Sequence, residues 1–205
     1  MTHSLHRRGS VESLKNDFVI IARSSVDVNR KGCGPKFQRI RQILSEAGPV
    51  NAGMMETGEN MARGGFTEKW LARTSDDTII AATFSSKDKV RQVLSRLKQE
   101  DLGISITVSG LIDEVFGLAR ELGLKPHTVN LSLGVHGKTE LLPPEEVLQV
   151  TTMCGHALAA TALAAKLKED IRAGRVSPQE AARQLAEPCV CGIFNMERAA
   201  ALLRD

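Results

Sequence analysis

Two kinds of apolar pattern alternate over the first two thirds of the chain. Short apolar runs at residues 18–22 and 78–84 predict buried strands. Residues 104–108 and 128–133 place apolar side chains at every second position, which predicts two further strands with one buried face. The sequence therefore predicts a sheet of four or more strands.

Helices are predicted between these strands, because apolar residues recur there at spacings of three and four. They cover residues 37–47, 86–97 and 111–122, with Ser86 as an N-cap. Strands that alternate with helices predict an α/β (α+β) domain over residues 15–140, with a ferredoxin-like or similar mixed sheet, after a flexible tail at residues 1–14.

The pattern becomes wholly helical beyond Pro143 and Pro144. An alanine-rich stretch predicts one long helix over residues 154–173, ended by Gly174. The capping box that begins at Ser177 opens a second helix, and Asn195 caps a third. Residues 141–205 are thus expected to form a small helical domain. Alanine-rich faces at residues 157–165 and 199–201 permit close helix contacts, within one chain or in a homo-oligomer.

Composition is that of a water-soluble globular protein, with 42% hydrophobic and 25% charged residues. No apolar run is long enough to cross a membrane, and no apolar segment follows the basic residues at the start, so a cytoplasmic protein is expected. A net charge of only +3 and an aromatic content of 3% argue against nucleic-acid binding.

Cysteine placement carries the main chemical signal. Three of the four cysteines lie in the last quarter of the chain: Cys154, Cys189 and Cys191. Glycine follows Cys154 and Cys191, which permits close approach of the backbone. In a reducing compartment, such a group indicates metal binding or catalysis rather than a disulfide framework. A thiol at the start of a helix would also have a lowered pKa, so Cys154 is expected to be a thiolate.

We interpret these cysteines as ligands of an oxygen-sensitive [4Fe–4S] cluster. Cys154, Cys189 and Cys191 would hold it, and either Cys33 or His156 could supply a fourth ligand. Without a fourth ligand, one iron would stay open and act as a Lewis acid on a small-molecule substrate, as in a lyase, hydratase or desulfidase.

Three alternatives remain open at this stage. The protein could hold its cluster without being an enzyme, for electron transfer or cofactor assembly with a redox partner protein. Cys154, His156, Cys189 and Cys191 could instead form a Cys3His zinc site in a binding module. In the third alternative the cysteines bind no metal and are either a redox-active pair or chemically inert.

A second candidate region is the polar, glycine-flanked loop that follows the predicted strand at residues 128–133. If it faces the cysteines, His136 is the preferred acid or base, Lys138 is the preferred anion-binding group, and His156 stands beside the cysteines as a further catalytic candidate. A solvated loop is the simpler reading.

Two glycine-containing loops carry weaker signals. Residues 48–65 form a glycine-rich stretch without a phosphate-binding motif and are expected to be a long loop, a lid or a partner contact. Residues 30–35, before a helix, could offer backbone N–H groups to an anionic ligand.

Overall fold

The computed structural model describes residues 4–64 and 73–204 of the 205-residue chain. Its centre is a four-stranded sheet in the order β2-β3-β1-β4, in which every neighbouring pair is antiparallel. The strands are β1 Phe18–Arg23, β2 Asn51–Met54, β3 Ile79–Phe84 and β4 Ser105–Ser109. Helix α2 Gly34–Glu46 connects β1 to β2, and helix α4 Lys87–Glu100 connects β3 to β4. This βαββαβ order is the ferredoxin-like arrangement, so the predicted α+β fold is confirmed.

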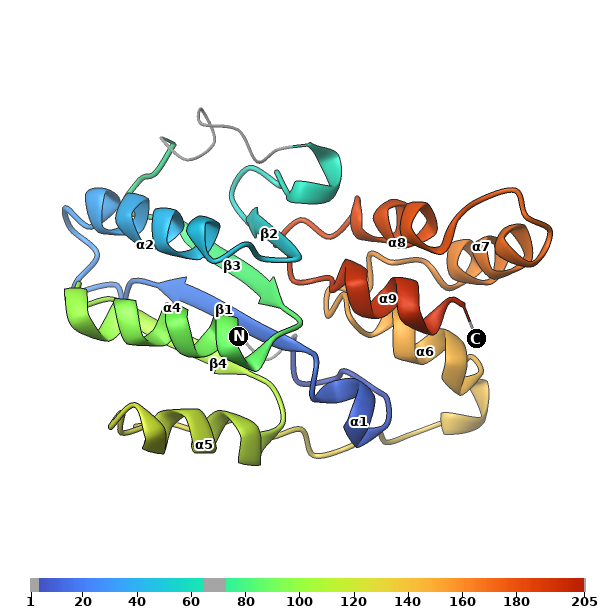
Figure 1. Ribbon diagram of the computed structural model, residues 1–205, viewed down its shortest axis with the longest axis horizontal. Helices are drawn as coiled ribbons and strands as arrows, with labels where there is room; N and C mark the ends of the chain where they lie inside the picture. The colour runs from blue at the N-terminus through green and yellow to red at the C-terminus, as the bar shows by residue number, and fades with distance from the viewer. Residues whose placement is uncertain (1–3, 65–72, 205) are drawn as a thin grey trace.

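One face of the sheet is covered by α2 and α4 (Figure 1). Side chains from β1 such as Phe18 and Ile20 pack there against Phe37 of α2 and Val93 of α4, and all four are buried. Helix α4 begins as expected, because the Ser86 side chain accepts a hydrogen bond from the Lys89 N–H.

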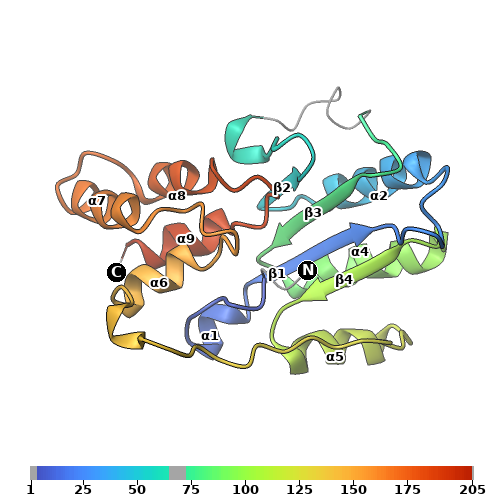
Figure 2. The same ribbon diagram turned by 180° about the vertical axis from the view of Figure 1, so that it is seen from behind.

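The other described helices surround this unit: α1 Val11–Leu14, α5 Ile112–Glu121, α6 Glu145–Thr151, α7 Thr161–Arg172, α8 Pro178–Ala186 and α9 Met196–Leu202, with short 3-10 turns η1 Met61–Arg63 and η2 Thr139–Leu141. Helices α6 to α9 gather at one end of the sheet (Figures 1 and 2). Helices α6 to α9 share a second apolar core with Val19, Ile21 and Ala81, whose side chains point to the opposite face of the sheet from those of the first core.

Three predicted elements differ from the structure. The helix predicted over 154–173 is present only as α7 Thr161–Arg172, which ends before Gly174 as expected; residues 154–160 are not helical, and Ala157 has a left-handed φ of 56° that no α-helix contains. Residues 128–133 form no strand, because no neighbouring strand hydrogen-bonds to them in the described chain. The glycine-rich stretch 48–65 contains β2 and η1, although residue 65 lies outside the described chain.

The segment before β1, expected to be a loose tail, is tied to the rest of the molecule from Ser4 onward. Ser4 is buried, and the Arg7 side chain forms an ion pair with buried Asp17. Residues 1–3 lie outside the described chain. Within the residues described, no helix combines the length and apolarity that crossing a membrane requires.

Candidate functional site: a buried cysteine cluster

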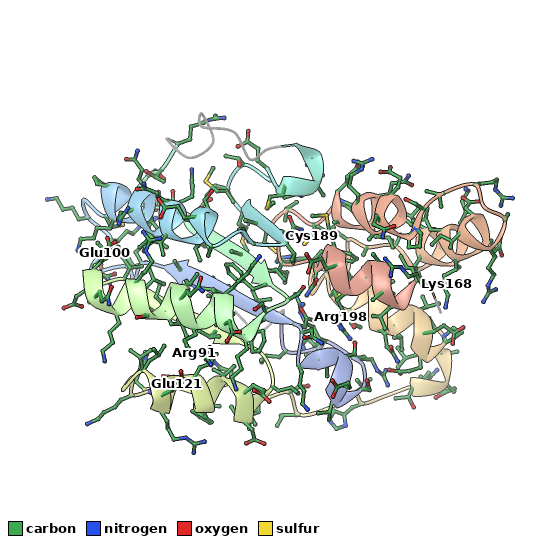
Figure 3. The ribbon with its side chains drawn as sticks, viewed as in Figure 1. Arg91, Glu100, Glu121, Lys168, Cys189 and Arg198 are labelled. Carbon is green, nitrogen blue, oxygen red and sulfur yellow. The ribbon has the colours of Figure 1, made fainter. Side chains whose placement is uncertain are left out.

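Three cysteines meet in the second core, between the sheet and helices α6 to α9. Cys154 lies in the loop between α6 and α7, whereas Cys189 and Cys191 lie in the loop between α8 and α9. All three side chains are buried among the apolar residues of this core and carry no disulfide. Figure 3 places Cys189 where the loop before α9 approaches β2. The predicted convergence of distant sulfurs is therefore present in the fold.

Short contacts join the cysteines to His156. The Cys189 and Cys191 Sγ atoms are 3.9 Å apart, and the Cys154 thiol is hydrogen-bonded to Cys189. The Cys191 Sγ lies 3.6 Å from Nδ1 of His156, whose side chain is exposed at the rim. As these side chains lie, no group of three or more His, Cys, Asp or Glu in the described ranges is arranged to hold a metal ion.

The pKa values of the three cysteine thiols are shifted in different directions. The hydrogen bond with Cys189, together with burial, raises the pKa of Cys154 far above its ordinary value. The hydrogen bond from Cys154 lowers the pKa of Cys189, but the hydrogen bond to Cys191, burial and the charge of Cys191 outweigh it and raise that pKa to about 11. The hydrogen bond from Cys189 lowers the pKa of Cys191. Cys191 is therefore the sulfur that most readily becomes a thiolate.

This result corrects the expected role of Cys154. The sequence predicts a thiolate there because a helix was expected to begin at that residue. Helix α7 instead begins at Thr161, so the Cys154 thiol has no helix N-terminus to lower its pKa. Burial in an apolar core acts in the opposite direction, since it disfavours the charged form.

Two glycines allow the cysteine loop to lie directly on the sheet. A Cβ atom added at Gly53 of β2 would meet the Gly192 nitrogen at 2.7 Å and the Cys191 carbonyl carbon at 2.8 Å. Gly192 itself has a φ of 70°, which is a left-handed conformation. The Thr83 hydroxyl of β3 donates to the Gly192 carbonyl at 3.3 Å, which fixes the loop against the sheet.

Polar side chains from the glycine-rich stretch hold the same loop from another side. The Asn60 amide donates to the carbonyls of Glu187 and Cys189, at 3.1 and 3.0 Å. Arg63 donates to the Glu187 carbonyl at 2.6 Å. The stretch that the sequence predicts to be a lid or a partner contact is, up to Gly64, a clamp on the cysteine loop.

Arg7 links the two cysteine-bearing segments. Its guanidinium donates to the Met153 carbonyl at 3.4 Å and to the Ile193 carbonyl, so it reaches the residue before Cys154 and the second residue after Cys191. Asp17 forms ion pairs with both Arg7 and Arg198, and all three side chains are buried. Figure 3 shows Arg198 on the side of α9 that faces α1.

Cys33, an expected fourth ligand, is not brought to the other sulfurs. It belongs to the core on the α2 side of the sheet, and α2 begins at the end of the sheet away from α6 to α9 (Figure 1). Its thiol donates to the Asp76 carbonyl at 3.4 Å. The Asp76 carboxylate accepts the N–H groups of Gly32 and Gly34 at 2.7 and 2.9 Å, so the expected anion site before α2 holds the protein's own carboxylate.

His136 and Lys138 also lie apart from the cysteines. Residues 125–138 are exposed and run from the end of α5 past α1 to η2, on the far side of the molecule from α8 (Figures 1 and 2). His136 Nε2 makes its hydrogen bond within this loop, to the Leu133 carbonyl at 3.0 Å. Of the three predicted catalytic residues, the structure brings only His156 to the cysteines.

The residues that position the site were missed by sequence reasoning. Arg7 lies 146 and 186 positions away from its two carbonyl partners, and Asn60 lies 129 away from Cys189. No local pattern marks contacts over such separations, so only the fold could reveal them. The one available signal was the position of Asn60 and Arg63 in the glycine-rich stretch, which was expected to be a lid or a partner contact.

Comparisons with known proteins add no assignment. No protein-family model, curated protein or solved structure matches this chain. The chemistry of the cysteine cluster is therefore the only basis for a functional assignment.

Proposed function

We propose that Cys154, His156, Cys189 and Cys191 bind one soft metal ion, with Zn²⁺ as the first candidate, and that the protein is a zinc-stabilised binding module. Two distances support this proposal. A tetrahedral ion with bonds of about 2.3 Å to sulfur and about 2.05 Å to nitrogen has sulfur–sulfur edges of about 3.8 Å and sulfur–nitrogen edges of about 3.6 Å. The corresponding separations are 3.9 Å between Cys189 and Cys191 and 3.6 Å between Cys191 and His156.

Metal binding at this site requires side-chain adjustment and proton release. The Cys154 and Cys189 thiols hydrogen-bond to each other and have raised pKa values, so an ion must displace their protons and turn both sulfurs toward a shared centre. The buried position favours a structural role, because the ion would join the loop between α6 and α7 to the loop between α8 and α9. His156 at the exposed rim would complete the set as the fourth ligand.

The iron–sulfur prediction stays a prediction, and so do its enzymatic and electron-transfer versions. In a four-iron cluster each thiolate binds a different iron, so the sulfurs are separated by the cluster itself and lie farther apart than ligands of one ion. The 3.9 Å separation of Cys189 and Cys191 therefore favours a single ion. A cluster would require these two sulfurs to move apart.

Metal analysis of the purified protein tests the proposal. We expect one Zn²⁺ per chain, and a Co²⁺-loaded form with the absorption of tetrahedral thiolate coordination. Cys189→Ala should abolish stoichiometric binding, whereas Cys33→Ala is the matched control, since it removes a buried cysteine from the other core. His156→Ala should leave a three-sulfur site that binds Co²⁺ more weakly and with an altered spectrum.

Two outcomes would contradict the single-ion site. Iron and sulfide in equal amounts after anaerobic purification would replace it with a cluster. If the wild-type protein binds neither Zn²⁺ nor Co²⁺ after reduction of its thiols, the proposed metal site is excluded. Circular dichroism of each variant checks that loss of binding does not come from loss of the fold.

A further inference from the structure

The surface segment 128–135 has the pattern of a strand but no strand partner in the part of the chain that the structure describes. Its apolar side chains occur at every second position and face solvent. They are Val129, Leu131, Leu133 and Val135, with exposed fractions of 47%, 66%, 90% and 53%. Soluble proteins rarely leave such a row of large apolar side chains uncovered, so this row indicates a contact surface.

The segment also lacks the features that normally keep a strand from pairing with another chain. No charged residue or proline occurs from Thr128 to Val135. None of its N–H groups donates to another backbone group in the described ranges, and the Gly134 N–H reaches only the Ser132 hydroxyl at 3.2 Å. Its other backbone groups can form a β-ladder once Gly134 leaves its φ of 95° for an extended conformation and the Leu133 carbonyl is released from His136.

The order of the apolar residues is complementary to itself. If two copies pair antiparallel about a two-fold axis at Ser132, Val129 of one copy lies opposite Val135 of the other, and Leu131 lies opposite Leu133. Every apolar position then meets an apolar position. We propose that this segment forms a homodimer by antiparallel pairing with the same segment of a second copy.

The competing arrangement is closure within one chain. Helix α5 connects β4 to the segment, so the segment could add to the free edge of β4 as a fifth, parallel strand. A groove of about 650 Å³, lined by Thr107 of β4, Phe116 of α5 and Val129 among others, separates the two. Closure would also pair the backbone of the segment. It would not, however, use the self-complementary order of its apolar residues.

Sedimentation equilibrium over a range of protein concentrations tests the dimer. We expect the wild type to dimerise, and Leu131→Lys or Leu133→Lys to raise the dissociation constant at least about tenfold, because each substitution removes a buried leucine from both copies. Val28→Lys is the matched control, since Val28 is 83% exposed and lies outside the segment. A wild type that stays monomeric, or a dimer that both lysine variants leave intact, would overturn the proposal.

Amide hydrogen exchange distinguishes the dimer from closure. In the dimer, protection of the Leu131 and Leu133 amides increases with protein concentration and disappears in Leu133→Lys. Protection that is the same at every concentration would show that the segment closes onto β4, which would also overturn the proposal. Neither measurement depends on metal at the cysteines, so the dimer can fail or succeed independently of the zinc site.

Discussion

Replacing Gly53 by alanine tests whether the cysteine loop lies as close to the sheet as the structure has it. The new Cβ would be 2.7 Å from the Gly192 nitrogen and 2.8 Å from the Cys191 carbonyl carbon, closer than Cβ atoms approach other groups in real proteins. Both neighbours are backbone atoms of a loop that Thr83 and Asn60 hold in place. The contact can therefore be relieved only by moving the loop or bending β2.

Overpacking of this kind costs about 1–3 kcal/mol. A loss of about 2 kcal/mol in a chain of this size lowers the melting temperature by about 4–8 °C. The substitution should also weaken Co²⁺ binding, because a displaced loop no longer holds the Cys189 and Cys191 sulfurs at their present separation. Urea unfolding followed by circular dichroism measures the first effect, and a cobalt titration measures the second.

Gly117→Ala is the matched control. Gly117 lies inside helix α5, and the nearest atom to an added Cβ is the Lys87 ammonium nitrogen at 3.9 Å. Alanine in a helix interior is favoured over glycine by about 0.5–1 kcal/mol, so this variant should be more stable than the wild type. If Gly53→Ala instead unfolds at the wild-type urea concentration and binds Co²⁺ equally well, the close approach of loop and sheet is refuted.

Three further predictions concern charged and titrating groups. Asp17→Ala should destabilise the protein by about 3–5 kcal/mol in urea unfolding, because it leaves Arg7 and Arg198 buried without their carboxylate; a wild-type midpoint would contradict the ion-pair network. The N–H groups of Gly32 and then Gly34 lower the pKa of Asp76, so its contribution is complete above its ordinary pKa of about 3.9 and is lost as the pH falls through the lower folded value. Asp76→Asn should accordingly be less stable than the wild type at pH 7, with a gap that narrows below about pH 4, and a pH-independent gap would exclude this cause. Since Cys154 and Cys189 must lose protons to bind metal, Co²⁺ affinity should rise by about tenfold per pH unit for each proton released between pH 6 and 8, and a flat profile would show that these thiols are not ligands.

Local pattern identified most elements of the ferredoxin-like unit. The apolar run at residues 18–22 became β1, the run at 78–84 became β3, and the alternation at 104–108 became β4 with a shift of one residue. Helix starts were equally readable, because Ser177 and Asn195 accept the N–H hydrogen bonds expected of N-caps. Such signals are contained in a few neighbouring residues, which is why sequence alone carries them.

Elements that depend on a partner elsewhere in the chain were predicted poorly. Strand β2 has no apolar run of its own, and it forms because Asn51 to Met54 pair with β3. Residues 128–133 have a clear strand pattern but no strand partner among residues 4–64 and 73–204, so they form no strand. The helix expected from residue 154 begins only at Thr161, because the chain turns between α6 and α7 so that α6 packs against α9 and α7 against α8.

For the cysteines, sequence by itself supplied the candidate groups: four thiols and an imidazole whose chemistry would suit a soft metal. Tertiary structure decided which residues meet. It placed His156 beside Cys191, and it placed Cys33 in the other core, across the sheet. It also decided which sulfur favours the thiolate, because burial and hydrogen bonds between thiols replace the helix terminus that was expected at Cys154. Residue type sets what a group can bind, but distance and burial depend on contacts between segments far apart in the chain.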